Sequence, residues 1–196
     1  MIKHRLHRLK KQITQIILLS TLYSLLSTLF IGCGYTTRSV ISNRFKTIYI
    51  TPFVNKIDIT KEADVGYKYK LYRSMLETEI TRKVINKYLS DGNLRPVKEE
   101  SADLILKGEL VEFQRVPLRY TDNDEVEEYR LNILVNLSLW DRRENKLIWQ
   151  ENNFTGKYTY FTSFTTSGTP QSEDAAVSSA LDDLARRIVE RTVEQW

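Results

Sequence analysis

The side chains that carry most enzyme chemistry are scarce in this sequence. It contains two histidines, His4 and His7, and a single cysteine, Cys33. Both histidines lie in the first ten residues, which we expect to be removed with a signal peptide. The remaining chain would have no imidazole. Serine–histidine catalysis, cysteine–histidine catalysis and histidine-ligated zinc are therefore not predicted.

Carboxylates are the remaining candidates for catalysis. They are dense at Asp122, Asp124, Glu125, Glu127 and Glu128, and a carboxylate pair can support glycoside hydrolysis. A catalytic acid needs a raised pKa, which requires apolar surroundings that this segment lacks. The seven glycines are scattered and form no phosphate-binding loop. We therefore predict that the protein is not an enzyme and uses no cofactor or metal.

Two groups of residues are candidates for binding. Basic residues at predicted strand ends could contact phosphates of an anionic partner, and aromatic residues among Ser and Thr could contact a partner protein. Exposed charge explains the first group equally simply, and packing under a C-terminal helix explains the second. The basic group is Arg115, Arg119, Arg142, Arg143, Lys146 and Lys157, and the aromatic group is Tyr158, Tyr160, Phe161 and Phe164.

The N-terminus has the organisation of a lipoprotein signal peptide. Five Lys or Arg residues and no acid occur in the first eleven positions, a mostly apolar run follows from Ile13 to Ile31, and Gly32 directly precedes Cys33. We expect cleavage before Cys33 and attachment of a covalent lipid, diacylglycerol and palmitate, to that residue. Gly34 at the next position favours the outer membrane. The alternatives are an uncleaved transmembrane anchor and an ordinary secretory signal.

Three segments follow from this interpretation: a signal peptide at 1–32, the lipidated cysteine with a tether at 33–45, and one domain at 46–196. Removal of the signal peptide takes five of the 29 Lys and Arg residues and none of the 25 Asp and Glu residues, which leaves 24 basic against 25 acidic side chains. No excess of cations is left to replace phosphate counterions. Nucleic acid is therefore not an expected partner.

Hydrophobic periodicity predicts the elements of this domain. Apolar residues recur every three or four positions from Tyr72 to Tyr88 and from Val177 to Ile188, which is typical of amphipathic helices, and they alternate from Tyr129 to Leu139, which is typical of a strand. The predicted order is strand Thr47–Thr51, helix Tyr67–Leu89, strand Leu104–Phe113 with a bulge at Gly108, strand Tyr129–Leu139, a strand from Leu147, and a helix from Pro170 to Trp196 with Thr169 as its N-cap.

The order strand, helix, three strands, helix predicts an α+β fold. Each element has one apolar face, so two helices should cover one face of a four-stranded, mostly antiparallel sheet. The last two strands should form a hairpin. Polar side chains should line the opposite face, namely Arg130, Asn132, Asn136 and Ser138.

Several short segments, taken in order, resemble the LptE family of lipopolysaccharide-assembly lipoproteins. The resemblance spans most of residues 33–196 and ends in an Ala- and Leu-rich helix. The segments are Cys33-Gly34-Tyr35, KTIYITPFVN at 46–55, ADLILKG at 102–108, Glu128-Tyr129-Arg130 and Leu147-Ile148-Trp149. The resemblance implies an outer-membrane lipoprotein that faces the periplasm and plugs the lumen of the LptD β-barrel. It also implies assistance to barrel assembly and binding of lipopolysaccharide during delivery to the cell surface.

If the resemblance holds, the anionic partner of the basic group without Lys157 is expected to be lipopolysaccharide, and the aromatic group is expected to contact the partner protein. Arg119 is the counterpart of a basic residue in the loop before the Glu-Tyr strand. The second family loop corresponds to Thr162–Pro170, which contains no Lys or Arg. One alternative remains open, because Ile50–Asn55 also resembles the first strand of regulatory or secretion lipoproteins of the curli-secretion and penicillin-binding-protein-activator types.

Overall fold

The computed structural model describes residues 15, 44–58, 69–70, 73–164 and 168–194. The predicted signal peptide, Cys33 and nearly all of the tether lie outside these residues. Contacts divide the chain into two units, Met1–Thr37 and Arg38–Trp196, and the elements below belong to the second. Among the helices of the described residues, none is both long and apolar enough to cross a membrane.

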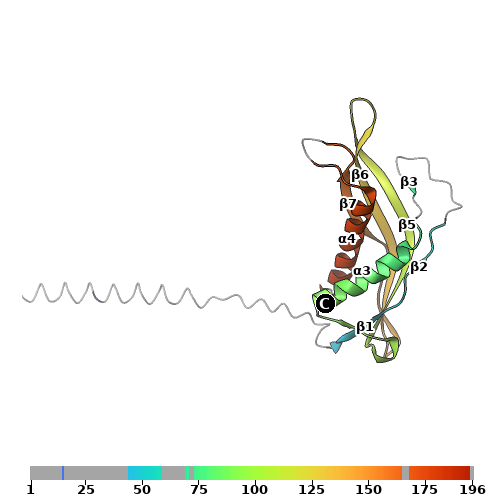
Figure 1. The fold of residues 1–196 in the computed structure, drawn as a ribbon. Helices are drawn as coiled ribbons and strands as arrows, with labels where there is room; N and C mark the ends of the chain where they lie inside the picture. Colours follow the sequence, from blue (N-terminus) through green and yellow to red (C-terminus); the bar gives the residue numbers. More distant parts are fainter. Residues whose placement is uncertain (1–14, 16–43, 59–68, 71–72, 165–167, 195–196) are drawn as a thin grey trace, which may run out of the picture. The chain divides into compact units, whose positions relative to one another are not determined.

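Three long strands form the centre of the sheet (Figure 1). They are β5 (Leu104–Tyr120), β6 (Val126–Asp141) and β7 (Lys146–Phe161), and each is antiparallel to the next. The predicted hairpin between the last two strands is therefore confirmed. The strands β5 and β6 extend beyond their predicted ranges, Leu104–Phe113 and Tyr129–Leu139, whereas β7 begins one residue before its predicted start at Leu147.

Short strands extend this sheet along the other side of β5. Parallel to β5 lie β1 (Thr47–Ile50) and β2 (Val54–Asn55), while β3 (Tyr69–Lys70) pairs with it antiparallel and β4 (Arg95–Pro96) pairs parallel with β1. The described residues thus form a seven-stranded mixed sheet with β4-β1-β5-β6-β7 as its main order. The predicted α+β class is confirmed. The prediction of a four-stranded, mostly antiparallel sheet was wrong. Two-residue strands carry no periodicity that a sequence could reveal.

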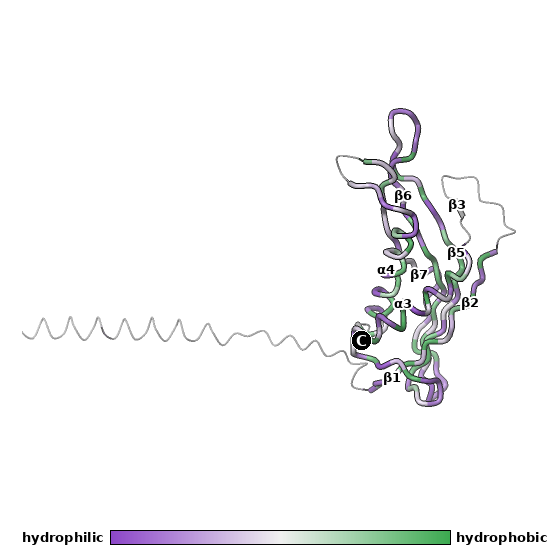
Figure 2. Tube along the Cα trace, viewed as in Figure 1, coloured by the Kyte–Doolittle hydropathy of each residue, from purple (hydrophilic) through white to green (hydrophobic). Residues whose placement is uncertain are grey.

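Two long helices, α3 (Leu76–Asp91) and α4 (Glu173–Glu194), pack against the sheet (Figures 1 and 2). A short 3-10 helix, η2 (Glu99–Ser101), precedes β5. The apolar stripes of both helices share one core with alternate residues of β6. The fully or almost fully buried residues include Leu131, Ile133, Val135, Leu137 and Leu139 of β6, Ile80, Val84 and Tyr88 of α3, and Leu181, Leu184 and Ile188 of α4.

Both helices begin later than the sequence predicted. Met75, which directly precedes α3, adopts a left-handed conformation with φ 61° and is 61% exposed, and the earlier Tyr69–Lys70 is strand β3 rather than helix. Before α4, the Ala175 N–H donates to Ser172 Oγ at 3.3 Å, so Ser172 is the N-cap instead of Thr169. Pro170 forms a parallel bridge with Phe161. A strand contact therefore occupies the position predicted as the first turn of the helix.

The irregularities of the long strands also differ from the prediction. Gly108 lies outside the register shifts of β5, the first of which falls between Leu110 and Glu112. Glycine is instead required there because the backbone lies close to the side chain of Phe53. A Cβ at position 108 would lie 2.2 Å from the Phe53 ring. In β7, Asn153 has φ 55° beside a register shift. This shift changes the alternation, so that Trp149 and Phe154 both point into the core.

Candidate functional site

The five basic candidates are divided between opposite ends of the sheet. We call the β6–β7 turn with Arg44–Thr47 and Asp103 the turn end, and the β5–β6 loop with residues 161–164 the loop end (Figure 1). The long strands have 16 or 17 residues, and at about 3.3 Å per residue they separate the two ends by roughly 50 Å. Arg142, Arg143 and Lys146 lie at the turn end, whereas Arg115 and Arg119 lie toward the loop end. They do not form one site.

At the turn end, Asp103 joins three segments of the chain. Its carboxylate accepts hydrogen bonds from the N–H groups of Lys46 (2.9 Å) and Thr47 (3.1 Å) and from Arg143 Nη2 (2.6 Å). Burial on its own would raise the pKa of Asp103, but the hydrogen bonds from Lys46 and Thr47 and the charge of Arg143 hold that pKa below its ordinary value. Arg143 therefore has a structural partner.

The other cations of the turn end differ in their availability. Arg44 donates to Asp141 at 3.1 Å and to Glu144 at 2.5 Å, so its charge is balanced. Arg142 and Lys146 are exposed, and their side chains have no hydrogen-bond or ion-pair partner among residues 44–58 and 73–164 or elsewhere in the described chain. Of the three predicted basic residues at this end, these two remain accessible to an anionic ligand.

Toward the loop end, Arg115 is part of an aromatic cluster. Its guanidinium pairs with Glu173 at 2.7 Å and lies 5.0 Å from the centroid of the Tyr129 ring, which stacks on Tyr160 at 5.9 Å. Burial and the charge of Glu173 raise the pKa of Tyr160, and Arg115 opposes this shift. The contacts of Arg115 hold α4 against β5 and β6, which is a structural role.

Arg119 is more accessible, but acids surround it. It approaches Glu127 and Glu128 at 3.5 Å each, which is long for an ion pair, and about half of its side chain is exposed. The adjacent loop carries the exposed residues Asp122, Asp124 and Glu125, and Figure 2 shows its tip as hydrophilic. This negative surface disfavours an anionic ligand at the loop end.

The aromatic candidates have different surroundings. Tyr160 is 3% exposed and belongs to the core, Tyr158 and Phe161 are half-buried, and Phe164 is 83% exposed. Phe161 packs against Gly168, where a Cβ would lie 2.1 Å from its ring. Core packing therefore explains Tyr160, and Phe164 is the one of the four placed for partner contact.

Sequence reasoning missed the exposed apolar side chains of β5. Leu118 (38%) and Tyr120 (46%) lie at the loop end, where Tyr120 pairs with Val126 and the hydroxyl of Thr162 donates to the carbonyl oxygen of Val126 at 2.8 Å. Both residues are therefore close in the fold to the segment that carries Phe164. A sequence signal exists, because apolar residues continue to alternate after Phe113, at Val116, Leu118 and Tyr120. The predicted strand ended at Phe113 and therefore left them out.

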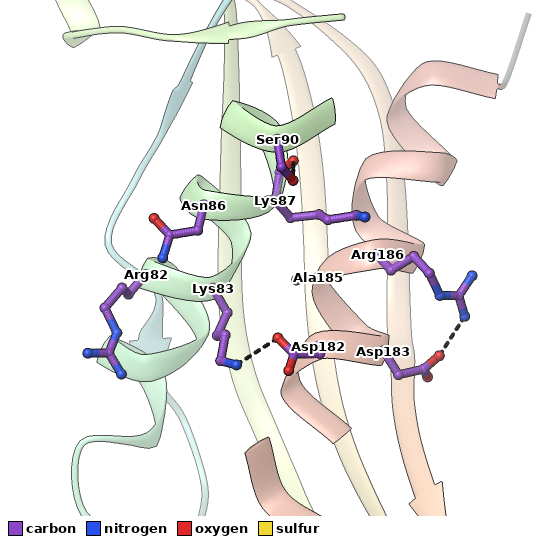
Figure 3. A pocket seen from close by; sticks show the side chains of 9 residues that line it. All are labelled: Arg82, Lys83, Asn86, Lys87, Ser90, Asp182, Asp183, Ala185 and Arg186. Carbon is purple, nitrogen blue, oxygen red and sulfur yellow. Dashed lines mark hydrogen bonds and ion pairs between the residues drawn. The ribbon is translucent and has the colours of Figure 1, made fainter. Parts of the chain in front are cut away.

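A polar groove of about 640 Å³ lies between α3 and α4 (Figure 3). Ion pairs close much of it, because Lys83 contacts Asp182 at 2.7 Å across the two helices and Arg186 contacts Asp183 at 2.6 Å on α4. Lys87 extends from α3 toward α4, whereas Arg82 and Asn86 turn away. The described residues contain no group of His, Cys, Asp and Glu side chains able to hold a metal. The groove is best explained as the seam between the helices.

Comparison with known proteins identifies the family. A family model described as "LptE: Lipopolysaccharide-assembly" matches residues 45–192. The chain belongs to the LptE family. The match contains all ten basic and aromatic candidates for binding, so the earlier resemblance is confirmed at the level of the family. No match was found among curated proteins.

Several solved structures are similar to this LptE-family chain at low sequence identity. A hypothetical protein from Chlamydia trachomatis is 14% identical, with 76% of this chain and 95% of that chain covered, at a TM-score of 0.48. The rare lipoprotein B from Shewanella oneidensis is 15% identical (74% and 94% covered, TM-score 0.45). A minor lipoprotein from Acinetobacter baumannii is 19% identical (76% and 90% covered, TM-score 0.42).

Proposed function

We propose that this LptE-family protein is the plug and assembly partner of the LptD outer-membrane barrel and assists delivery of lipopolysaccharide to the cell surface. The observation that carries the proposal is the family match over residues 45–192, which spans nearly all of the described fold. In this role the protein acts by shape and binding, without catalysis and without a cofactor. Its lipid would be attached to Cys33 and hold it at the periplasmic face of the outer membrane.

The position of the turn end supports an orientation in which this end lies near the lipid anchor. The domain begins at Lys46, whose N–H binds Asp103. Twelve residues lie between Cys33 and Lys46, and the thirteen residue steps, at about 3.3 Å each, keep the turn end within roughly 43 Å of the lipid. Arg142 and Lys146 would then face the membrane side, where anionic lipid groups are available. The loop end, with Phe164 and Leu118, would extend from there into the lumen of the barrel.

Recovery of the barrel from cells tests the proposal. The tagged, lipidated protein is expected to copurify with LptD, and its depletion should reduce lipopolysaccharide at the cell surface. Recovery of a peptidoglycan glycosyltransferase, or a ring of copies seen by microscopy, would instead support the regulatory or secretion alternative. Failure to recover any large β-barrel under conditions that keep the protein lipidated would overturn the proposal.

The anchor is tested separately. The Cys33→Ala protein should lose membrane attachment while its folded domain keeps the same far-UV circular dichroism and unfolding midpoint, because the core lies within residues 45–193. Membrane fractionation and denaturant unfolding measure the two properties. If the Cys33→Ala protein stays in the membrane fraction, the apolar run from Ile13 to Ile31 is an uncleaved anchor.

A further inference from the structure

The free edge of β7 is covered along only part of its length. In the covered part, Arg187 donates to the carbonyl oxygen of Thr155, Asp183 accepts from the N–H of Lys157 at 3.0 Å, and the N–H of Gln171 donates to the carbonyl oxygen of Phe161 at 2.9 Å. These bonds satisfy backbone groups that an edge strand would otherwise present to another chain. The covered part therefore runs from Thr155 to Phe161.

The lengths of the two elements explain why the cover is incomplete. The 22 residues of α4 span about 33 Å at 1.5 Å per residue, whereas the 16 residues of β7 span about 53 Å. The helix begins near the end of β7, and near its own C-terminus Arg191 pairs with Glu151 at 2.8 Å. The first third of β7 extends beyond the helix.

The uncovered part is Lys146–Glu151. In the described chain, no side chain or loop bonds to the backbone of this segment from the side opposite β6. Its charges lie at its two ends, Lys146 and Glu151, and the four residues between them are uncharged. Leu147 is 38% exposed. Uncharged, partly apolar edges of this kind pair readily with other strands.

Side chains of α4 still reach the uncovered part. Trp149 is 8% exposed and points into the core, and the Arg191 guanidinium lies 5.0 Å from the centroid of its ring. This contact joins two side chains, so it leaves open the backbone N–H and C=O groups of Lys146–Glu151 that point away from β6.

We propose that Lys146–Glu151 pairs with an extended segment of the partner barrel protein, which adds a strand to this sheet; this inference rests on the proposed function. An extended backbone is the occupant that matches a row of alternating N–H and C=O groups. Six residues of pairing bury too little surface to hold two free proteins together. The segment therefore belongs to a protein already held by other contacts, which raises its effective concentration.

Hydrogen–deuterium exchange on the lipidated protein, alone and in complex with LptD, tests this pairing. Amides within Lys146–Glu151 that point away from β6 are expected to exchange quickly in the free protein and at least 100-fold more slowly in the complex. The Lys157 amide, already bonded to Asp183, should change little. A complex that forms without added protection at Lys146–Glu151 would overturn the inference while leaving the proposed function intact. Absence of any complex would overturn the proposed function itself.

Leu147→Lys is compared with Leu89→Lys, because both leucines are exposed (38% and 60%) and Leu89 lies on α3, outside the sheet. A lysine on an edge strand opposes strand addition. The Leu147→Lys complex should lose the added protection, and recovery of the barrel should fall several-fold, whereas the Leu89→Lys complex should keep the protection. Protection that appears in the free protein as its concentration rises would identify a second copy of this chain as the occupant and would also overturn the inference.

Discussion

The Asp183 carboxylate on α4 accepts a hydrogen bond from the backbone N–H of Lys157 on β7 at 3.0 Å. The same carboxylate accepts from Arg186 Nη2 at 2.6 Å, and this second bond fixes its orientation. A helix side chain thus replaces the missing neighbour of an edge strand. This contact holds α4 to the sheet and decides where along β7 the backbone is closed to other strands.

Asp183→Ala should destabilise the domain by about 1–2 kcal/mol, because it leaves the Lys157 N–H without its acceptor and Arg186 without one of its carboxylates. The free energy of unfolding in urea measures this loss. The matched control is Asp182→Ala, which removes only the exposed ion pair with Lys83 and should cost less than about 0.5 kcal/mol. Equal losses in the two variants would contradict the capping role of Asp183.

Tyr88 links α3 to α4 inside the core. Its hydroxyl donates to Thr192 Oγ1 at 2.8 Å, and the Thr192 hydroxyl donates to the carbonyl oxygen of Ile188 at 2.9 Å. Tyr88→Phe should cost about 1 kcal/mol near pH 8, because the Thr192 hydroxyl keeps its bond to Ile188 but loses the donor from Tyr88. The free energy of unfolding of the two proteins at pH 8 measures this difference.

The same pair predicts a dependence on pH. Burial raises the pKa of Tyr88 well above its ordinary value of 10.0, so the unfolded chain releases this proton at a lower pH than the folded chain. The contribution is complete below about pH 10 and is lost at about 1.4 kcal/mol per pH unit as the pH rises from there toward the folded pKa. The difference between wild type and Tyr88→Phe should therefore shrink above pH 10. A constant difference would contradict ionisation linked to burial.

Asp103 should make the domain sensitive to acid. Because its folded pKa is lowered, the stability that it contributes is present above the unfolded pKa of about 3.9 and is lost as the pH falls through the folded pKa. Asp103→Ala should cost about 2–3 kcal/mol at pH 7, since it leaves the Lys46 and Thr47 N–H groups and Arg143 without their shared acceptor. Unfolding measured from pH 7 to pH 2 should show this difference shrinking as the pH falls, whereas the exposed Asp122→Asn should match wild type throughout.

The sequence predicted the long elements because their burial repeats regularly. The alternation from Leu131 to Leu139 and the stripe from Val177 to Ile188 identify the faces that the structure buries. The short strands could not be predicted in this way, since β3 and β4 have two residues each and depend on the edges of β5 and β1. Helix starts failed for a related reason, because Pro170 is engaged by Phe161 rather than by the helix.

The candidate site was predicted only in its residue types. Side-chain type alone grouped Arg115 and Arg143 with Arg142 and Lys146. In the structure, Arg115 pairs with Glu173 and Arg143 pairs with Asp103. These partners lie 58 and 40 residues away in the sequence, respectively. No local pattern reveals such pairs. The cover on β7 depends in the same way on the length of one helix relative to one strand.

At Gly156, α4 lies close against the sheet. A Cβ at this position would lie 2.4 Å from Leu184 Cβ and 2.8 Å from its Cα, and Leu184 is fully buried. Gly156→Val should therefore push the helix away and destabilise the domain by about 3 kcal/mol or more, because backbone atoms have to move. Urea unfolding measures the loss, with Thr155→Val as the control on the neighbouring, partly exposed position. Retention of wild-type stability would contradict this packing.

Charge reversal at the two ends of the sheet should show which end meets anionic lipid. Arg142 and Lys146 have no side-chain partner among the described residues, whereas Arg119 lies among five acids, Asp122, Asp124, Glu125, Glu127 and Glu128. Arg142→Glu with Lys146→Glu should weaken binding to lipopolysaccharide-containing vesicles about tenfold, and added salt should reduce this difference because the contacts are exposed. Arg119→Glu should change binding less than threefold. Vesicle cosedimentation at 50 and 300 mM salt measures both effects, and a larger loss for Arg119→Glu would assign the lipid contact to the loop end.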